Sequence, residues 1–374
     1  MVMAQPTLPF NLGLGPITCH AWNKDKTQLA LSPNNSEIHV YQLRGGQWQR
    51  LHVLSEHDLP VTGIDWAPNT NRLVTCSQDK NAFVWTFDGA SGEWKPELVL
   101  VRLQRAATCV RWSPAENKFA VGSASKLVSV CYYEKENDWW VAKQIKKSIR
   151  STVNSIDWHP NNILIAVGSC DFKTRIYSAY VKEVDEKPSP SPWGTKLPLG
   201  QLLNETSNGG GGWVHCVRFS PDGNKVAWVG HDSSLSVLDS ANMETVSTVK
   251  DEYLPFTSLE WMNDSAIVAA GHDCCPMLFH YSGPGKLQFA SKLDVPSEQK
   301  SNKLTAMSKF RDMDKKAATD SGTIVKTLHQ NTITQMALHT FDSHRSVQKF
   351  STCAIDGQII IWDLKALKAS VPSV

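Results

Sequence analysis

The chain has 374 residues, with 38 basic and 36 acidic side chains and a formal net charge of +2. This near balance argues against a dedicated nucleic-acid-binding protein, which usually carries a basic excess. Hydrophobic residues make up 41% of the chain, enough to form a sizeable core in a protein of this length. No apolar run approaches the roughly 18 residues that a membrane span requires, so we expect no membrane span.

The first 18 residues contain no Lys or Arg and are interrupted by prolines, so we expect neither a signal peptide nor a transit peptide. The nine cysteines form no C-x-x-C pair, which argues against common zinc-ribbon and thioredoxin sites. Free thiols without a secretory signal favour the cytosol.

A short apolar-polar alternation that ends in an aromatic residue recurs six times. Successive aromatics are separated by 44, 46, 46, 61 and 42 residues: Trp22, Trp66, Trp112, Trp158, Phe219 and Trp261. Alternation with many β-branched and aromatic residues predicts strands. A period of about 40–45 residues is that of a four-stranded propeller blade.

Two further landmarks keep a fixed distance from these aromatics. The first follows 19 residues later, at Tyr41, Trp85, Cys131, Tyr177 and Leu238. The second lies six residues before the first, at Asn35, Asp79, Ser125, Asp171 and Asp232, with Asp273 and Asp356 in the sixth and seventh units. We expect these short polar side chains in the turn before the third strand, bonded to nearby backbone N–H groups.

The repeats resemble the WD-repeat family, and the namesake dipeptide is present once, as Trp362-Asp363. The resemblance implies an all-β, seven-bladed β-propeller formed by residues 1–374 as a single domain. The family's buried His–Ser–Asp–Trp network maps onto the second blade, at His57, Ser77, Asp79 and Trp85. In the seventh blade His329, Asp356 and Trp362 match, but Ala354 replaces the serine.

The last unit begins near Ile333 and has a longer first turn, predicted at 340–348. Only 11 residues follow Asp363, too few for a full fourth strand. We therefore expect residues 7–14 to supply the outer strand of this blade and to close the ring, which removes exposed sheet edges.

Two insertions interrupt the repeats, and we expect both to lie outside the blades. Residues 182–212 contain alternating prolines and a run of four glycines, which predicts an extended and flexible loop. Residues 296–328 separate the sixth and seventh blades, and 301–316 is rich in helix formers. Apolar side chains recur there every three residues among basic ones, which predicts a projecting amphipathic helix with candidate partner-binding residues Leu304, Met307, Phe310, Arg311 and Met313. Packing of this helix onto its own propeller remains an alternative to a membrane-surface or partner contact.

A basic stretch follows Trp139 and Trp140 and includes the candidate partner-binding residues Lys143, Lys146 and Lys147. It is either an ordinary solvated outer strand and turn or a landing site for an acidic partner segment.

Motifs for catalysis or cofactor binding are absent from the sequence. There is no G-x-x-x-x-G-K-[ST], G-x-S-x-G or H-E-x-x-H. Two Gly-His-Asp triplets, at 230–232 and 271–273, occupy the same slot of adjacent blades, so the repeat explains their aspartates better than a metal does. We expect no catalytic residues, no cofactor and no metal, although a catalytic triad assembled in space would escape a motif search.

Several segments resemble a narrower family, the WD-repeat subunits of the actin-related protein 2/3 complex. The most specific are Glu-Asn-Asp-Trp-Trp-Val at 136–141 and Gly-His-Asp-Cys-Cys-Pro-Met at 271–277, and matches run in order from residue 17 to 363. The resemblance implies a non-catalytic subunit in an assembly that nucleates branched actin filaments in the cytoplasm. It also implies contacts with the other subunits, one of them actin-related.

In that family the insertion between blades six and seven projects as a helix that is implicated in contacts with the mother filament or with nucleation-promoting factors. Those factors end in acidic, Trp-containing tails, which suit the basic stretch by charge. We expect no homo-oligomer. A WD-repeat scaffold of another cytosolic assembly and a propeller hydrolase remain alternatives.

Overall fold

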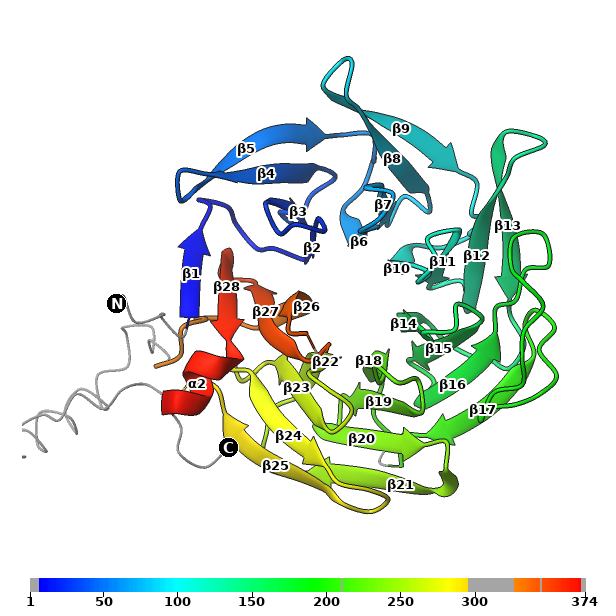
Figure 1. Ribbon diagram of the computed structural model, residues 1–374, viewed down its shortest axis with the longest axis vertical. Coiled ribbons are helices and arrows are strands. Elements are labelled where there is room, and N and C mark those ends of the chain that lie inside the picture. The colour runs from blue at the N-terminus through cyan, green and yellow to red at the C-terminus, as the bar shows by residue number, and fades with distance from the viewer. Residues whose placement is uncertain (1–6, 210, 295–325, 344, 371–374) are drawn as a thin grey trace, which may run out of the picture.

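The computed structural model describes residues 7–209, 211–294, 326–343 and 345–370. Within these ranges the strands form seven four-stranded antiparallel sheets, arranged as blades around a central channel (Figure 1). The predicted all-β, seven-bladed propeller is therefore confirmed. The one helix of the described ranges, α2 (Leu364–Ser370), follows the last strand. No helix in this part of the chain is long and apolar enough to cross a membrane.

Each blade runs outward from the channel. The innermost strands, from blade one to blade seven, are β2 (Cys19–Trp22), β6 (Val61–Trp66), β10 (Ala107–Trp112), β14 (Val153–Trp158), β18 (Val214–Phe219), β22 (Phe256–Trp261) and β26 (Ile333–Phe341). The second strands are β3 (Gln28–Ser32), β7 (Leu73–Ser77), β11 (Lys118–Ser123), β15 (Leu164–Ser169), β19 (Lys225–Gly230), β23 (Ala266–Gly271) and β27 (Val347–Ala354).

The outer half of each blade is more exposed. The third strands are β4 (Ile38–Arg44), β8 (Ala82–Asp88), β12 (Leu127–Glu134), β16 (Lys173–Ser178), β20 (Ser234–Asp239), β24 (Met277–Tyr281) and β28 (Gln358–Asp363). The outermost strands are β5 (Gln47–Leu54), β9 (Glu93–Val99), β13 (Trp139–Ile145), β17 (Leu202–Ser207), β21 (Asn242–Lys250), β25 (Leu287–Lys292) and β1 (Thr7–Asn11).

The N-terminal strand closes the ring, as predicted. β1 pairs antiparallel with β28, from Thr7 opposite Trp362 to Asn11 opposite Gln358, so the first and last strands lie side by side (Figure 1). Pro9 lies within β1, where a missing N–H group is tolerated because the outermost strand has one unpaired edge.

Two boundary predictions were wrong. The turn between β26 and β27 spans 342–346 rather than 340–348, because both strands extend toward it across register shifts. The segment 182–212 is not wholly a loop, since β17 pairs with β16 and completes blade four. The connection before it also packs inward: Trp193 is 3% exposed and donates its indole N–H to the Gly223 carbonyl at 2.8 Å.

The predicted buried network exists in blade two, but with a different hydroxyl. His57 Nδ1 lies 2.8 Å from Asp79, and His57 Nε2 lies 2.9 Å from the hydroxyl of Thr75, not Ser77. The same hydroxyl accepts the indole N–H of Trp85 at 3.0 Å. The side chain of Ser77 instead donates to the Leu59 carbonyl at 2.7 Å. Thr75 projects from the same face of β7 as Ser77, since the two are two residues apart on a strand.

This correction also completes the network of blade seven. His329 contacts Asp356 at 3.1 Å and the Thr352 hydroxyl at 2.7 Å, and Thr352 accepts the Trp362 indole N–H at 2.8 Å. The network is therefore complete although Ala354 occupies the position where the family has serine.

The aspartates predicted in the turn before the third strand bind the connection that leads into the same blade. A carboxylate oxygen of Asp171 accepts the backbone N–H of Arg150 at 2.8 Å, and Asp273 accepts that of Leu254 at 2.9 Å. Asp79 and Asp356 do the same for Asp58 and Gln330. In blade five, Asp232 binds the side chain of Asn208, whose carbonyl accepts the Trp228 indole N–H.

A second set of polar side chains links each blade to the next near the start of the inner strands. A threonine hydroxyl or an asparagine amide donates to a backbone carbonyl of the following blade at 2.5–3.3 Å, in six of the seven blades: Thr18, Thr62, Thr108, Asn154, Thr257 and Thr334. The Thr334 bond to the Ile17 carbonyl joins blade seven to blade one. His215 takes this position in blade five and contacts His231 at 3.0 Å instead.

Replacement of Thr75 by valine is expected to destabilise the fold by about 2–3 kcal/mol. The change preserves shape but leaves two buried groups, the His57 imidazole and the Trp85 indole, without their shared partner. Ser77→Ala is the control and should lose less, about 1–2 kcal/mol, because it removes the bond to the Leu59 carbonyl and the one accepted from the Asp79 backbone N–H but leaves His57 and Trp85 paired. Urea unfolding measures both. Equal losses for the two variants would contradict the assignment of Thr75 to the network.

Candidate interaction sites at the channel and on the loops

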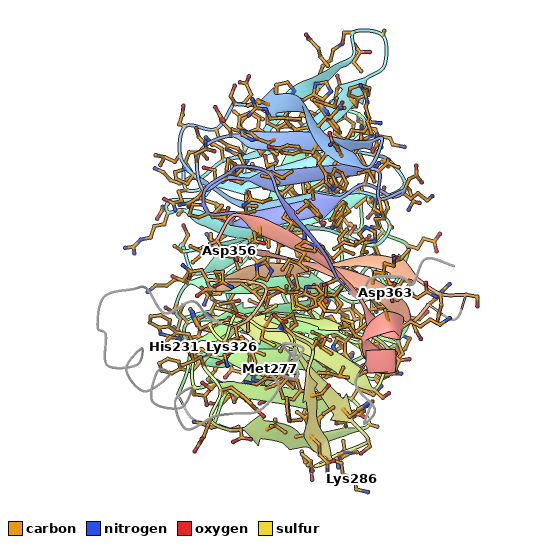
Figure 2. All side chains as sticks on the ribbon, turned by 90° about the vertical axis from the view of Figure 1, so that its left-hand side faces the viewer. His231, Met277, Lys286, Lys326, Asp356 and Asp363 are labelled. Carbon is orange, nitrogen blue, oxygen red and sulfur yellow. The ribbon has the colours of Figure 1, made fainter. Side chains whose placement is uncertain are left out.

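The two faces of the ring present different surfaces. Strands alternate in direction, so the connections between blades share one face with the turns between second and third strands. Figure 2 shows the ring edge-on, with Asp356 and His231 on this connection face and Asp363 on the opposite face. The inner strands end on the opposite face, which we call the strand-end face.

The channel holds a larger cavity at the strand-end face, which we call the wide mouth, and a smaller one at the connection face, which we call the narrow end. A cavity of about 600 Å³ lies at the wide mouth, and one of about 190 Å³ lies at the narrow end among the ring of threonines. The wide mouth has an apolar rim formed by turn residues and by the end of β26: Pro68, Pro160, Pro221, Leu338 and Phe341. Phe341 is 49% exposed.

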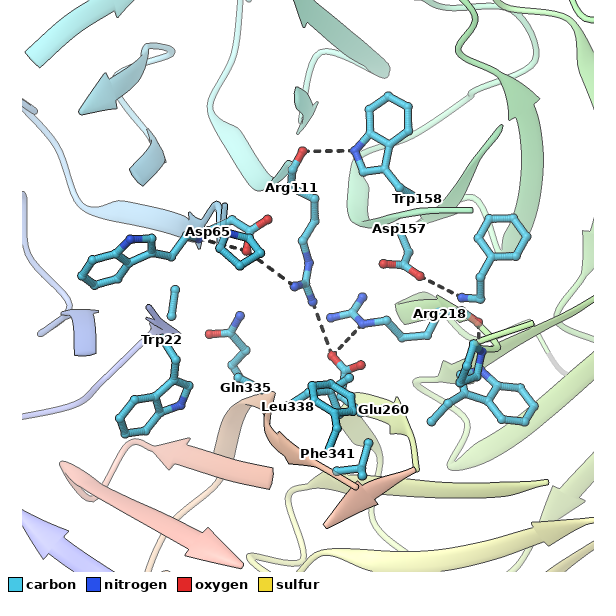
Figure 3. Close-up of a pocket in the computed structure, with 18 of the residues that line it drawn as sticks. Trp22, Asp65, Arg111, Asp157, Trp158, Arg218, Glu260, Gln335, Leu338 and Phe341 are labelled. Carbon is cyan, nitrogen blue, oxygen red and sulfur yellow. Dashed lines mark hydrogen bonds and ion pairs between the residues drawn. The ribbon is translucent and has the colours of Figure 1, made fainter. Parts of the chain in front are cut away.

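The floor of this cavity is a layer of charges. The residue before the terminal aromatic of the inner strand is charged in blades two to six: Asp65, Arg111, Asp157, Arg218 and Glu260. Acids and bases therefore alternate around the channel (Figure 3). These positions share one repeat register, so closure of the ring brings them to the same depth.

Both arginines of the layer turn toward one glutamate. Arg218 Nε lies 2.8 Å from Glu260 Oε1, and Arg111 Nη2 lies 3.4 Å from the same oxygen. Arg111 also reaches Asp65 at 4.0 Å (Figure 3). Both partners of the Arg218–Glu260 pair are 8% exposed, so this ion pair is largely shielded from water.

The two aspartates of the layer anchor the next blade. Asp65 Oδ2 accepts the Trp112 backbone N–H at 2.7 Å, and Asp157 Oδ2 accepts the Phe219 backbone N–H at 2.8 Å. Burial raises the pKa of Asp157 to about 6 and raises that of Asp65 as well. Near the rim, burial lowers the pKa of Lys26 to about 8. Sequence reasoning missed this layer, although the charges recur at a fixed position before each aromatic.

The predicted basic stretch divides into paired and free residues. Lys143 lies on β13, 2.8 Å from Glu183, and its ammonium group lies 5.1 Å from the centre of the Tyr132 ring. It is therefore a neutralised part of the blade surface. Lys146 and Lys147 are exposed in the connection between β13 and β14.

Other exposed cations lie beside Lys146 and Lys147. The Arg102 carbonyl accepts the Gln144 side-chain amide at 3.0 Å, and the Arg105 backbone N–H binds the Ser125 hydroxyl at 2.8 Å. These bonds place the connection before β10 next to the turn that precedes β12 and the end of β13. We define the basic loop patch as Arg102, Arg105, Lys126, Lys146, Lys147 and Arg150. Within the described ranges, none of the six forms an ion pair.

The other predicted interaction element cannot be placed. Leu304, Met307, Phe310, Arg311 and Met313 lie outside the described residues. The connection that contains them leaves β25 and enters β26, so both of its ends lie on the connection face, the face that carries the basic loop patch.

The histidines of the two Gly-His-Asp triplets make separate contacts. His231 Nδ1 lies 3.0 Å from His215 Nε2, and His272 Nδ1 lies 3.0 Å from the Thr332 hydroxyl. No group of three potential metal ligands occurs among the residues that the structure describes. All nine cysteines are free thiols, and the vicinal pair Cys274 and Cys275 is buried.

Replacement of Glu260 by glutamine should destabilise the fold by about 3–5 kcal/mol. It removes the carboxylate that Arg111 and Arg218 share, so the buried Arg218 guanidinium loses its one close ion pair among the described residues. Glu183→Gln, which breaks the half-exposed pair with Lys143, is the control and should change stability by less than about 1 kcal/mol. Denaturant unfolding of both variants measures the difference. A similar small effect for both would show that the channel charges are solvated.

Comparison with known proteins identifies the family. A profile described as "WD domain, G-beta repeat" matches residues 48–86, 143–178, 201–239 and 322–363. The chain is 56% identical over 361 residues to actin-related protein 2/3 complex subunit 1A-B of Xenopus laevis, with 96% of each chain covered.

More distant relatives carry the same name. The chain is 42% identical to actin-related protein 2/3 complex subunit 1 of Schizosaccharomyces pombe, covering 92% of this chain and 96% of the relative. It is 39% identical to subunit 1B of Arabidopsis thaliana, covering 94% and 95%. The WD-repeat propeller described here therefore belongs to the family of actin-related protein 2/3 complex subunit 1.

Proposed function

We propose that this protein is a non-catalytic scaffold subunit of the actin-related protein 2/3 complex and supports the nucleation of branched actin filaments. The observation that carries the proposal is the identity of 56% over 96% of the chain to a subunit of that complex. A rigid ring of blades displays loops at fixed positions, which suits a protein that holds several partners at once. The proposed partners are the other subunits, one of them actin-related, and the mother filament.

The proposed location follows from these partners: the cytoplasm, in cortical actin networks. A scaffold role is also consistent with the chemistry of the described residues, whose buried charges serve mainly in ion pairs and in bonds that join blades.

Size-exclusion chromatography of cell lysate tests the proposal. The protein should elute far above its own mass of 41.5 kDa, and mass spectrometry of the same fractions should find two actin-related proteins. Elution with unrelated chains would instead favour a WD-repeat scaffold of another cytosolic assembly. Elution as a monomer with turnover on a substrate panel would favour the hydrolase alternative.

We further propose that the basic loop patch receives the acidic tails of nucleation-promoting factors. Its six exposed cations lack ion-pair partners among the described residues, so an acidic segment would meet uncompensated positive charge. Such contacts steer association and weaken as salt screens them over about 8–10 Å. Lys143 is left out of this proposed site, because it is already paired with Glu183.

Charge-reversal variants distinguish specific binding at the basic loop patch from a general effect of net charge. The triple variant Lys126→Glu, Lys146→Glu and Lys147→Glu should bind a labelled acidic tail about tenfold more weakly, or worse, at physiological salt. The control reverses three exposed lysines in turns of the strand-end face, Lys24, Lys135 and Lys286, and carries the same net charge. Fluorescence anisotropy measures the affinity. Equal weakening in both triples would reject the patch as a specific site.

The insertion at 296–328 is proposed to contact the mother filament or a nucleation-promoting factor through its apolar stripe. Phe310→Asp should leave assembly intact but lower branch density, because a charge replaces an apolar anchor. Ser308→Asp adds the same charge off the stripe and should leave branching near normal. Branch density is counted by fluorescence microscopy of reconstituted networks. Normal branching with fully incorporated Phe310→Asp would defeat the proposal.

A further inference from the structure

Ser-Pro dipeptides occur five times in the chain, and the fold presents them in different ways. Such a dipeptide is the minimal acceptor of proline-directed protein kinases, which transfer phosphate to the serine hydroxyl. The serines are Ser32, Ser113, Ser189, Ser191 and Ser220. The dipeptide itself does not distinguish them, so burial and hydrogen bonding decide which of them an enzyme can reach.

Three of the five serines are buried in the blades. Ser32 is 0% exposed, and Ser113 and Ser220 are each 1% exposed. Their hydroxyls also bond within the blades: Ser113 donates to the Asn117 side chain at 3.1 Å, and Ser220 donates to the Lys225 carbonyl at 3.2 Å. Phosphorylation of any of these three would require local unfolding of a blade.

Ser189 lies in the connection between β16 and β17, on the strand-end face. Residues 186–190 have no secondary structure, and no hydrogen bond joins them to any other residue that the structure describes. Ser189, Pro190 and Lys187 are all exposed. A residue before a proline is restricted to extended conformations, so the alternating prolines keep this segment extended. The segment can therefore enter an enzyme cleft without loss of hydrogen bonds to the blades.

Both ends of this segment are fixed to the propeller. Asp185 pairs with Lys118, and the two side chains are 1% and 0% exposed. At the other end, the buried Trp193 donates its indole N–H to blade five. Between these anchors the segment borders a cavity of about 660 Å³, which turns of blades three, four and five also line. The anchors therefore hold 186–190 over open space and display it on the surface.

Ser191 is less suited to an enzyme cleft than Ser189. Its backbone N–H and carbonyl both bond to Gly194 at 3.0 Å, in the turn that contains Trp193. Its hydroxyl lies 3.4 Å from the Gly194 carbonyl, and the residue is only half-exposed. An extended binding pose would break this turn and pull on the Trp193 anchor, whereas Ser189 has no such bonds to break.

We propose that Ser189 is a phosphate acceptor for a proline-directed serine/threonine protein kinase. The serine oxygen attacks the γ-phosphorus of ATP, and the bond from that phosphorus to the β,γ-bridging oxygen breaks. ADP leaves, and the hydroxyl proton passes to the catalytic aspartate of the kinase. This inference does not rest on the scaffold role proposed above, since it uses only the burial and hydrogen bonds of this chain.

The new phosphate would stay in solvent. A phosphoserine adds about two negative charges at neutral pH. The cavity beneath the segment is lined by Asp185 and Asp222, and the lysines beside them, Lys118 and Lys225, are already paired with these carboxylates. Repulsion by the carboxylates keeps a phosphate outward, so phosphorylation changes the charge of the strand-end face and leaves the blades in place.

A phosphorylation assay tests the inference. The full-length chain is purified from cells with the chains that accompany it, treated with phosphatase, and incubated with radiolabelled ATP and a mitogen-activated protein kinase. Mass spectrometry should locate the phosphate at Ser189. Ser189→Ala should lower incorporation about tenfold or more, because the remaining Ser-Pro hydroxyls cannot be positioned in line with ATP. Ser191→Ala is the matched control and should keep most of the incorporation.

The Pro190→Ala variant tests the class of kinase. The Ser189 hydroxyl remains in place, but the proline that follows it is lost, so incorporation should fall to about the level of Ser189→Ala. Urea unfolding of all three variants checks that the fold persists. Equal incorporation in the unmodified sequence and in Ser189→Ala, full incorporation in Pro190→Ala, or phosphate mainly on another serine would overturn the inference.

Discussion

The fold depends on closure of the ring. A single blade cannot cover both of its apolar faces, so each sheet is stable only between two neighbours. The last gap is filled by β1 on β28, which lie more than 340 residues apart in sequence. The Thr334 hydroxyl then bonds the Ile17 carbonyl and completes the connections between blades. Because closure joins the two ends of the chain, every other blade depends on it for its packing.

Closure also creates the chemistry of the channel. Five charged residues at one repeat position have no contact in sequence, but the ring brings them to one depth around a shared cavity. Glu260 contacts both arginines, whereas Asp157 binds the Phe219 backbone N–H and lies in the field of the same two arginines. The ring thus stabilises its buried charges through ion pairs and through bonds that join neighbouring blades.

The two faces of the ring carry different surfaces. The connection face carries the basic loop patch and both ends of the 296–328 insertion, and so the proposed contacts with acidic tails and with filaments. The strand-end face carries the wide channel mouth with its layer of alternating charges.

The sequence by itself determined the repeat, the number of blades and the closing strand, because strand periodicity and turn residues act over short distances. It also located the histidines, aspartates and tryptophans of the buried networks in blades two and seven. It misassigned the hydroxyl, because Ser77 and Thr75 project from the same face of one strand, and only packing brings Thr75 to His57. Only the tertiary structure decided which cations are paired: Lys143 meets Glu183 across two segments 40 residues apart, whereas Lys146 and Lys147 form no ion pair with the residues that the structure describes. The charge layer of the channel was likewise decided by closure, since distances between blades are set by packing rather than by local pattern.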